Sequence, residues 1–153
     1  MEIPYRQLEP REALKVYCDW LLEQRTDDFF RVFERGRPMY EWYMVFYPVR
    51  TLLLGGKLLN EPKYIEAALK YVDIYLTEQL PNGGFTSTYR RTPTASLTKS
   101  QIKEVMRTAN VNLADNGSNV LAIVQASEYV TGKKRQKYLD AARKWFDDWV
   151  CIW

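Results

Sequence analysis

One stretch of this sequence occurs twice, and that repeat constrains the fold more than any other feature. Residues 64–76 align with residues 138–150 without a gap. We call the shift that takes position 64 to position 138 the repeat offset. A fainter copy runs through residues 13–21 and precedes the first strong copy at a shorter offset. In the strong copies apolar side chains recur at helical spacing along one face, which is typical of an amphipathic helix. The sequence therefore predicts one amphipathic helix that recurs along the chain.

A segment that is apolar on nearly all sides precedes each strong copy. These segments span residues 40–59 and 116–131, and a helix that is hydrophobic all round is a buried one. Pro48 lies inside the first segment, where we expect a kink or a fresh start of the helix. Buried helices that alternate with amphipathic ones are the signature of stacked αα-hairpins. We therefore expect an all-α fold of αα-hairpin repeats, and the uneven offsets argue against a short regular solenoid.

The rest of the chain adds a helix at each end and one long connection. The residues around Pro10 predict a helix that continues to about Arg25, and the last helix is expected over residues 136–152. Residues 81–112 form the connection, with a short helical piece from about Lys99 to Arg107. Connections this long within a compact domain are usually functional or mobile. We interpret residues 1–153 as one domain in which this connection lies at the functional rim.

Composition narrows the chemistry that such a fold could perform. The chain contains no histidine, so Ser-His and Cys-His catalysis and the common zinc sites are excluded within it. Acid-base work then falls to carboxylates, tyrosine or lysine. The net charge of +3 does not indicate a nucleic-acid-binding surface. No apolar run is long enough to span a membrane. Cys18 and Cys151 fit no metal or redox spacing, and we expect no cofactor.

The repeat offset pairs two acidic residues at the start of the buried helices. Asp115 opens the second buried helix and maps onto Glu41 at the start of the first. If the offset holds in this region, both carboxylates lie at the same end of adjacent helices. The helix dipole and the free N–H groups at that end stabilise an anionic side chain. The competing interpretation is structural, since Asp, Asn and Ser are ordinary N-caps and Asp115 would then only cap its helix.

The residues around Asp115 also resemble a known superfamily. Asp115-Asn116-Gly117 opens the buried helix, Thr131-Gly132-Lys133 ends it, and Tyr138-Leu139-Asp140-Ala141-Ala142 follows with Trp145 and Trp149. Over residues 37–152 this pattern resembles the six-hairpin (α/α) toroid glycosidases, including unsaturated glucuronyl hydrolases and glucosamine epimerase-like toroids. The resemblance implies a carbohydrate-active site in the mouth of the toroid. An acidic residue at the start of an inner helix would be its general acid/base.

The sequence departs from that superfamily in the number of its helices. Such toroids close with six hairpins, which amount to about twelve helices. This chain offers five clear helices and a short sixth. The resemblance therefore implies a partial (α/α)6 toroid that matches the N-terminal part of the family, either as a fragment or as a domain completed by another chain. An open stack of this kind exposes apolar flanks, which predicts association with a second copy or with a completing chain.

These observations favour glycoside hydrolysis, or a related reaction, on an acidic or unsaturated oligosaccharide. In this hypothesis Asp115 serves as general acid/base and Glu41 as the second carboxylate. The aromatic candidates would stack on a sugar ring, and an arginine would contact an anionic group. The candidate substrate contacts are Trp42, Tyr40, Asn116, Asn112 and Arg107.

Two other functions stay open. A helical-repeat binding module without chemistry would have no pocket that unites Glu41 and Asp115, and instead a concave surface lined by residues 81–112. An epimerase of the toroid type typically relies on histidine, which this sequence lacks. Met1 leads directly into a polar segment with no signal peptide, and cytoplasmic and periplasmic locations both stay open.

Overall fold

The protein is helical throughout the part of the chain that the structure describes. The computed structural model describes residues 8–24, 41–88, 93–109 and 112–151, and these ranges contain no β-strand. The expectation of an all-α fold is confirmed for them. The helices are α1 (Pro10–Gln24), α2 (Trp42–Leu59), α3 (Pro62–Leu76), α4 (Lys99–Thr108), α5 (Leu113–Ala126) and α6 (Gly132–Trp145). Two short 3-10 segments (Thr94–Ser96 and Ser127–Tyr129) and a π-helical turn, η4 (Phe146–Val150), complete the described elements.

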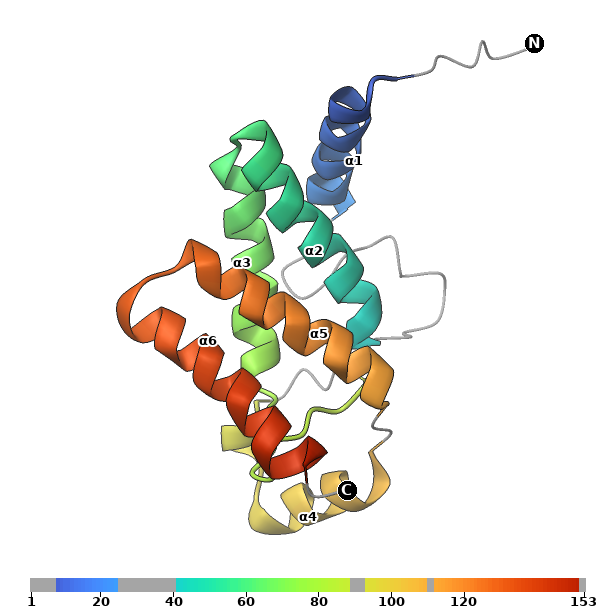
Figure 1. Ribbon diagram of the computed structural model, residues 1–153. Coiled ribbons are helices and arrows are strands. Elements are labelled where there is room, and N and C mark those ends of the chain that lie inside the picture. The colour runs from blue at the N-terminus through green and yellow to red at the C-terminus, as the bar shows by residue number, and fades with distance from the viewer. Residues whose placement is uncertain (1–7, 25–40, 89–92, 110–111, 152–153) are drawn as a thin grey trace, which may run out of the picture.

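Two helical hairpins form the body of the molecule (Figure 1). Asn60 ends α2 in the left-handed region with φ of 57°, and Pro62 starts α3 at once. The segment between residues 127 and 131 makes the corresponding turn between α5 and α6. α2 packs against α3, α5 and α1. Figure 1 shows α2 and α5 starting at the same side of the molecule, whereas α3 and α6 return in the opposite direction.

An aromatic cluster holds the start of α2 against the end of α3. The Tyr75 ring centroid lies 4.8 Å from those of both Trp42 and Phe46. Phe85 stacks on Tyr75 with a centroid distance of 4.3 Å, although it belongs to the loop that follows α3. All four rings are fully buried. Because Phe85 is part of this cluster, the loop after α3 folds back to the first turn of α2.

The buried positions of the first hairpin recur in the second at the repeat offset. In α2 the buried residues Val45, Phe46, Pro48, Val49, Leu52 and Leu53 correspond to the buried Asn119, Val120, Ala122, Ile123, Ala126 and Ser127. In α3 the buried Tyr64, Ala67, Ala68, Tyr71 and Tyr75 correspond to the buried Tyr138, Ala141, Ala142, Trp145 and Trp149. The same offset therefore relates the burial of α2 and α5, where the two sequences share little identity. Glu41 and Asp115 are counterparts by this measure, and both are half-buried.

Three helix boundaries differ from those expected from the sequence. α5 begins at Leu113 rather than at residue 116, because the side chain of Asn112 caps it. α6 begins at Gly132 rather than at residue 136, so the basic residues at 133–137 belong to its first turns. α2 runs through Pro48 without a fresh start. Proline costs a helix interior about 3 kcal/mol, and the buried apolar residues on both sides of Pro48 hold the helix together.

Candidate functional site

The first turns of α2 and α5 meet at one residue, Ser87. Its carbonyl oxygen accepts a hydrogen bond from the backbone N–H of Trp42 at 2.8 Å. Its hydroxyl oxygen accepts another from the backbone N–H of Asn112 at 3.1 Å. Ser87 is buried, and both donors are N–H groups that a helix start leaves without an intrahelical partner. The two helix starts, with Glu41 and Asp115, therefore lie at one rim of the molecule.

Glu41 is held to the loop that carries Ser87. It is the N-cap residue of α2, but its side chain makes no capping hydrogen bond. Its backbone forms an isolated antiparallel bridge with Thr88. The Thr88 hydroxyl donates to Glu41 Oε1 at 3.4 Å, which is a long contact. The Glu41 carboxylate thus stays half-exposed at the rim, with one weak donor beside it.

Asp115 is the third residue of α5 and does not cap it. Asn112 has that role, because its Oδ1 accepts from the backbone N–H of Ala114 at 2.9 Å and of Asp115 at 3.3 Å. Within the described residues, the Asp115 carboxylate accepts no hydrogen bond and joins no ion pair. The interpretation of Asp115 as the cap is therefore wrong. Its half-buried carboxylate sits in the positive end of the helix dipole and stays available to a ligand.

A buried polar network fixes the first turn of α5 from below. The Tyr75 hydroxyl donates to Asn116 Oδ1 at 2.8 Å and accepts from Asn119 Nδ2 at 3.3 Å. Asn116 Nδ2 donates in turn to the carbonyl of Asn112 at 3.0 Å. Burial raises the pKa of Tyr75 well above its usual range, so its hydroxyl remains a donor. Asn116 is fully buried and orients the helix start, whereas the sequence had marked it as a substrate contact.

Trp42 is also a core residue in this structure. It is fully buried, and its indole Nε1 donates to Glu78 Oε2 at 2.9 Å. No ring face is therefore open to a sugar. Glu78 is a carboxylate with 1% exposure that the sequence analysis did not single out. A charged side chain between Leu76 and Leu80 was the only sequence signal for it.

Two candidate residues remain, Tyr40 and Arg107. Tyr40 lies outside the described part of the chain. Arg107 lies on α4, where its guanidinium forms two hydrogen bonds to Glu104, at 2.6 and 3.0 Å. Its side chain is 71% exposed. Since its charge is balanced by a neighbour on the same helix, Arg107 is poorly placed to attract an anionic ligand to Asp115.

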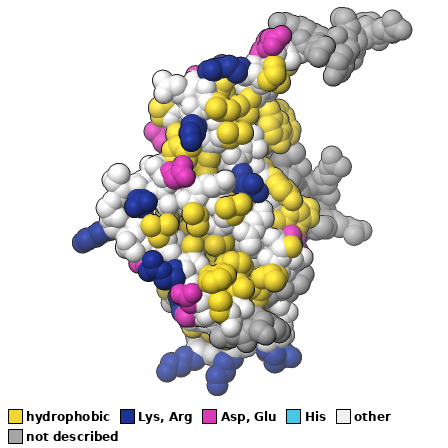
Figure 2. Space-filling view, in the orientation of Figure 1, with side chains coloured by type: hydrophobic (Ala, Val, Ile, Leu, Met, Phe, Trp, Pro, Cys, Tyr) yellow, Lys and Arg dark blue, Asp and Glu magenta, His cyan; other side chains and the backbone are white. Residues whose placement is uncertain are grey.

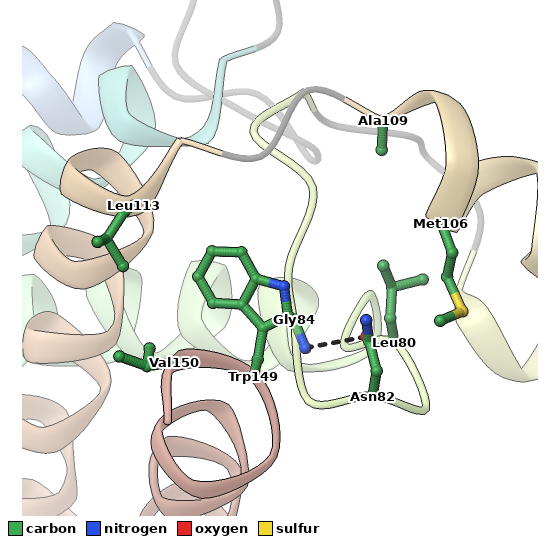
Figure 3. Close-up of a pocket in the computed structure, with 8 residues that line it drawn as sticks. All are labelled: Leu80, Asn82, Gly84, Met106, Ala109, Leu113, Trp149 and Val150. Atoms are coloured by element: carbon green, nitrogen blue, oxygen red, sulfur yellow. Dashed lines mark hydrogen bonds between the residues drawn. The ribbon is translucent and has the colours of Figure 1, made fainter. Parts of the chain in front are cut away.

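A separate cavity of about 610 Å³ lies on another side of the α5 start (Figure 3). It is lined by Leu80, Asn82, Gly84, Met106, Ala109, Leu113, Trp149 and Val150. Figure 3 shows Trp149 between Leu113 and Met106, next to the turn in which Gly84 N–H donates to Asn82 Oδ1. Leu113 and Asp115 are two residues apart and point to opposite sides of the helix, at about 100° per residue. The cavity and the Asp115 carboxylate are thus different features.

Comparison of the chain with protein-family models, with curated proteins and with solved structures found no match. No helix in the described ranges is long and apolar enough to cross a membrane. The same part of the chain brings together no three His, Cys, Asp or Glu side chains that could hold a metal ion. The assignment of a function therefore depends on the geometry of the rim and of the cavity.

Proposed function

We propose that the protein is a carbohydrate-active, glycoside hydrolase-like protein that acts on an oligosaccharide at the rim formed by α2 and α5. Asp115 is the general acid/base and Glu41 is the second carboxylate. The observation that carries this proposal is the junction at Ser87, to which the first backbone groups of both helices are hydrogen-bonded. That junction supports a common site for two carboxylates that start adjacent helices.

The chemistry of the chain supports the same roles. No histidine is present, so carboxylates are the natural groups for proton transfer near neutral pH. Asn112 takes the capping role and Asn116 anchors the turn, which leaves the Asp115 carboxylate for a ligand. The separation of the two carboxyl groups in the complex would set the outcome. About 5 Å corresponds to retention of configuration and about 6.5–9.5 Å to inversion.

The recurrence of burial at the repeat offset supports an αα-hairpin repeat of the toroid type. α2 and α5 would be its inner helices, and α3 and α6 its outer helices. In such an arrangement the inner helices start at the same rim, as the Ser87 junction requires. The proposed substrate is an acidic or unsaturated oligosaccharide. Trp42 and Asn116 act here as supports of the rim rather than as sugar contacts.

The test is the release of reducing sugar from a panel of acidic, unsaturated and neutral oligosaccharides. The Asp115→Asn variant should lose about 10²- to 10⁴-fold in rate, the usual contribution of a general acid or base. Asp140→Asn is the matched control, because Asp140 is exposed on α6 and the substitution removes the same charge. Wild-type activity in Asp115→Asn, or no turnover of any substrate by the wild type, would refute the proposal.

The cavity favours a second candidate, a helical-repeat module that binds a ligand without chemistry. Four of its lining residues, Asn82, Gly84, Met106 and Ala109, come from the 81–112 connection, where this alternative placed the binding surface. A mainly apolar wall with one tryptophan is typical of a ligand site. Saturable oligosaccharide binding that quenches tryptophan fluorescence, with no product formed and no effect of Asp115→Asn, would support this candidate instead.

A further inference from the structure

One kind of contact between amphipathic helices occurs twice in the structure, first between α1 and α3 and then between α3 and α6. The Tyr64 hydroxyl at the start of α3 donates to Asp19 Oδ1 on α1 at 2.6 Å. Lys63 Nζ donates to the same oxygen at 2.8 Å. Hydrogen bonds from Lys15, Lys63 and Tyr64 hold the pKa of Asp19 below its usual range, so the acceptor is anionic.

The second occurrence joins α6 to α3 in the same way. The Tyr138 hydroxyl donates to Asp73 Oδ1 at 2.8 Å, and Lys134 Nζ donates to Asp73 Oδ2 at 2.7 Å. Tyr138 is the counterpart of Tyr64 at the repeat offset. Burial raises the pKa of both tyrosines, so each hydroxyl remains a donor. α3 therefore docks on α1, and α6 on α3, each through a tyrosine and a lysine that share one aspartate.

A third aspartate, Asp147, binds no tyrosine or lysine of the described chain. Asp147 is the counterpart of Asp73 at the repeat offset, in the turn η4 that continues α6. It is exposed, and no described residue forms a hydrogen bond or an ion pair with its carboxylate. Its neighbour Phe146 is 54% exposed, whereas the counterpart of Phe146 on α3, Val72, is fully buried. Asp147 and Phe146 thus lie exposed on the continuation of α6, at the positions that correspond to Asp73 and Val72, with nothing from the described chain covering them.

Apolar side chains are also exposed on α5. Leu121 and Val124 on α5 are 47% and 40% exposed, respectively. Figure 2 shows hydrophobic side chains gathered on the face of the molecule that carries α5 and α6. If a further hairpin packed against this part of the molecule, its first helix would contact the apolar side chains of α5. Its second helix would contact Asp147 and Phe146. Exposed apolar side chains that lie together commonly mark an interaction surface.

We propose that the edge formed by α6 and η4 binds a further αα-hairpin, supplied by a partner protein. The second helix of that hairpin carries a tyrosine whose hydroxyl donates to Asp147, and a lysine beside it or one turn before it. A second copy of this chain does not supply the donor through its repeat tyrosines, because Tyr64 and Tyr138 already bind aspartates within the chain. This interaction does not depend on the chemistry proposed for the rim.

The decisive experiment extends the full chain by one period. Residues 78–151 are repeated once after residue 151, which places the duplicated Tyr138 at the same sequence distance from Asp147 as Tyr138 lies from Asp73. The extended chain should be monomeric, and its added helices should fold, as measured by circular dichroism and sedimentation. Asp147→Asn should then raise the unfolding constant of the added unit about tenfold, because it replaces the anionic acceptor of the hydrogen bond with a neutral one.

Two comparisons sharpen the result. Asp147→Asn in the parent chain should change nothing, and Asp140→Asn should leave the extended chain unchanged. Replacing the duplicated tyrosine by phenylalanine should reproduce the loss, and the two substitutions together should not add. The proposal is overturned by an added unit that stays unfolded, or by equal stability with and without Asp147. Self-association of the parent chain that Asp147→Asn abolishes would overturn it too, because the occupant would then be a second copy.

Discussion

The hydroxyl group of Tyr75 gives the sharpest test of how the rim is held. Tyr75 is fully buried in α3, and its hydroxyl joins two asparagines of α5, Asn116 and Asn119. The Tyr75→Phe variant removes one oxygen and leaves the ring in its aromatic cluster. The variant thereby isolates the hydrogen bonds from the burial of the ring. These two bonds join segments 41 and 44 residues apart in the sequence.

The expected loss of stability follows from the groups that would be left without a partner. Asn116 Oδ1 would lose its donor at 2.8 Å, and Asn119 Nδ2 would lose its acceptor at 3.3 Å. Asn119 Oδ1 already has no hydrogen-bond partner among the described residues. An unsatisfied buried polar group costs about 1–3 kcal/mol, and the longer bond contributes less. We therefore expect the free energy of unfolding to fall by about 2–4 kcal/mol.

The assay is urea unfolding followed by tryptophan fluorescence, with thermal unfolding as a second readout. For a chain of this size, 1 kcal/mol lowers the melting temperature by about 2–4 °C. The variant should therefore melt about 5–15 °C lower. Tyr47→Phe is the matched control, because Tyr47 is 60% exposed, and it should stay within about 0.5 kcal/mol of the wild type. A loss below about 0.5 kcal/mol in Tyr75→Phe would refute the role of this network.

The remaining predictions concern two glycines and a buried thiol. A Cβ at Gly84 would lie 2.9 Å from Trp149 Cδ1, so Gly84→Ala should cost about 1–3 kcal/mol. At Gly117 the nearest atom is 3.7 Å away, so Gly117→Ala should be neutral or stabilising in the same urea titration. Burial raises the pKa of the Cys18 thiol to about 11, whereas an unfolded thiol ionises near pH 8.5. Its contribution to stability is thus present below about pH 8.5 and falls as the pH rises toward about 11. A chromogenic disulfide reagent at pH 8 should label exposed Cys151 alone, and labelling of native Cys18 would contradict this.

The elements could be predicted from the sequence because helical periodicity is a local property. Apolar spacing alone located α3, and the turn at Asn60 and Pro62 marked its start. The match between residues 64–76 and 138–150 likewise predicted that Tyr64 and Tyr138 are equivalent, and both are buried. The start of α5 was misplaced by about one turn, because an asparagine cap looks like any loop asparagine until its N–H donors are in place.

The sequence by itself predicted that the chain is helical and that its helices recur, and it suggested the pairing of Glu41 with Asp115. Only the tertiary structure decided which residues are supports and which face solvent. Trp42 became a core residue because Glu78 accepts from its indole N–H, and Asn116 because Tyr75 lies beneath it. These two contacts join positions 36 and 41 residues apart in the sequence, respectively. Side-chain spacing within one helix carries no information about such partners, since they meet only when the hairpins pack.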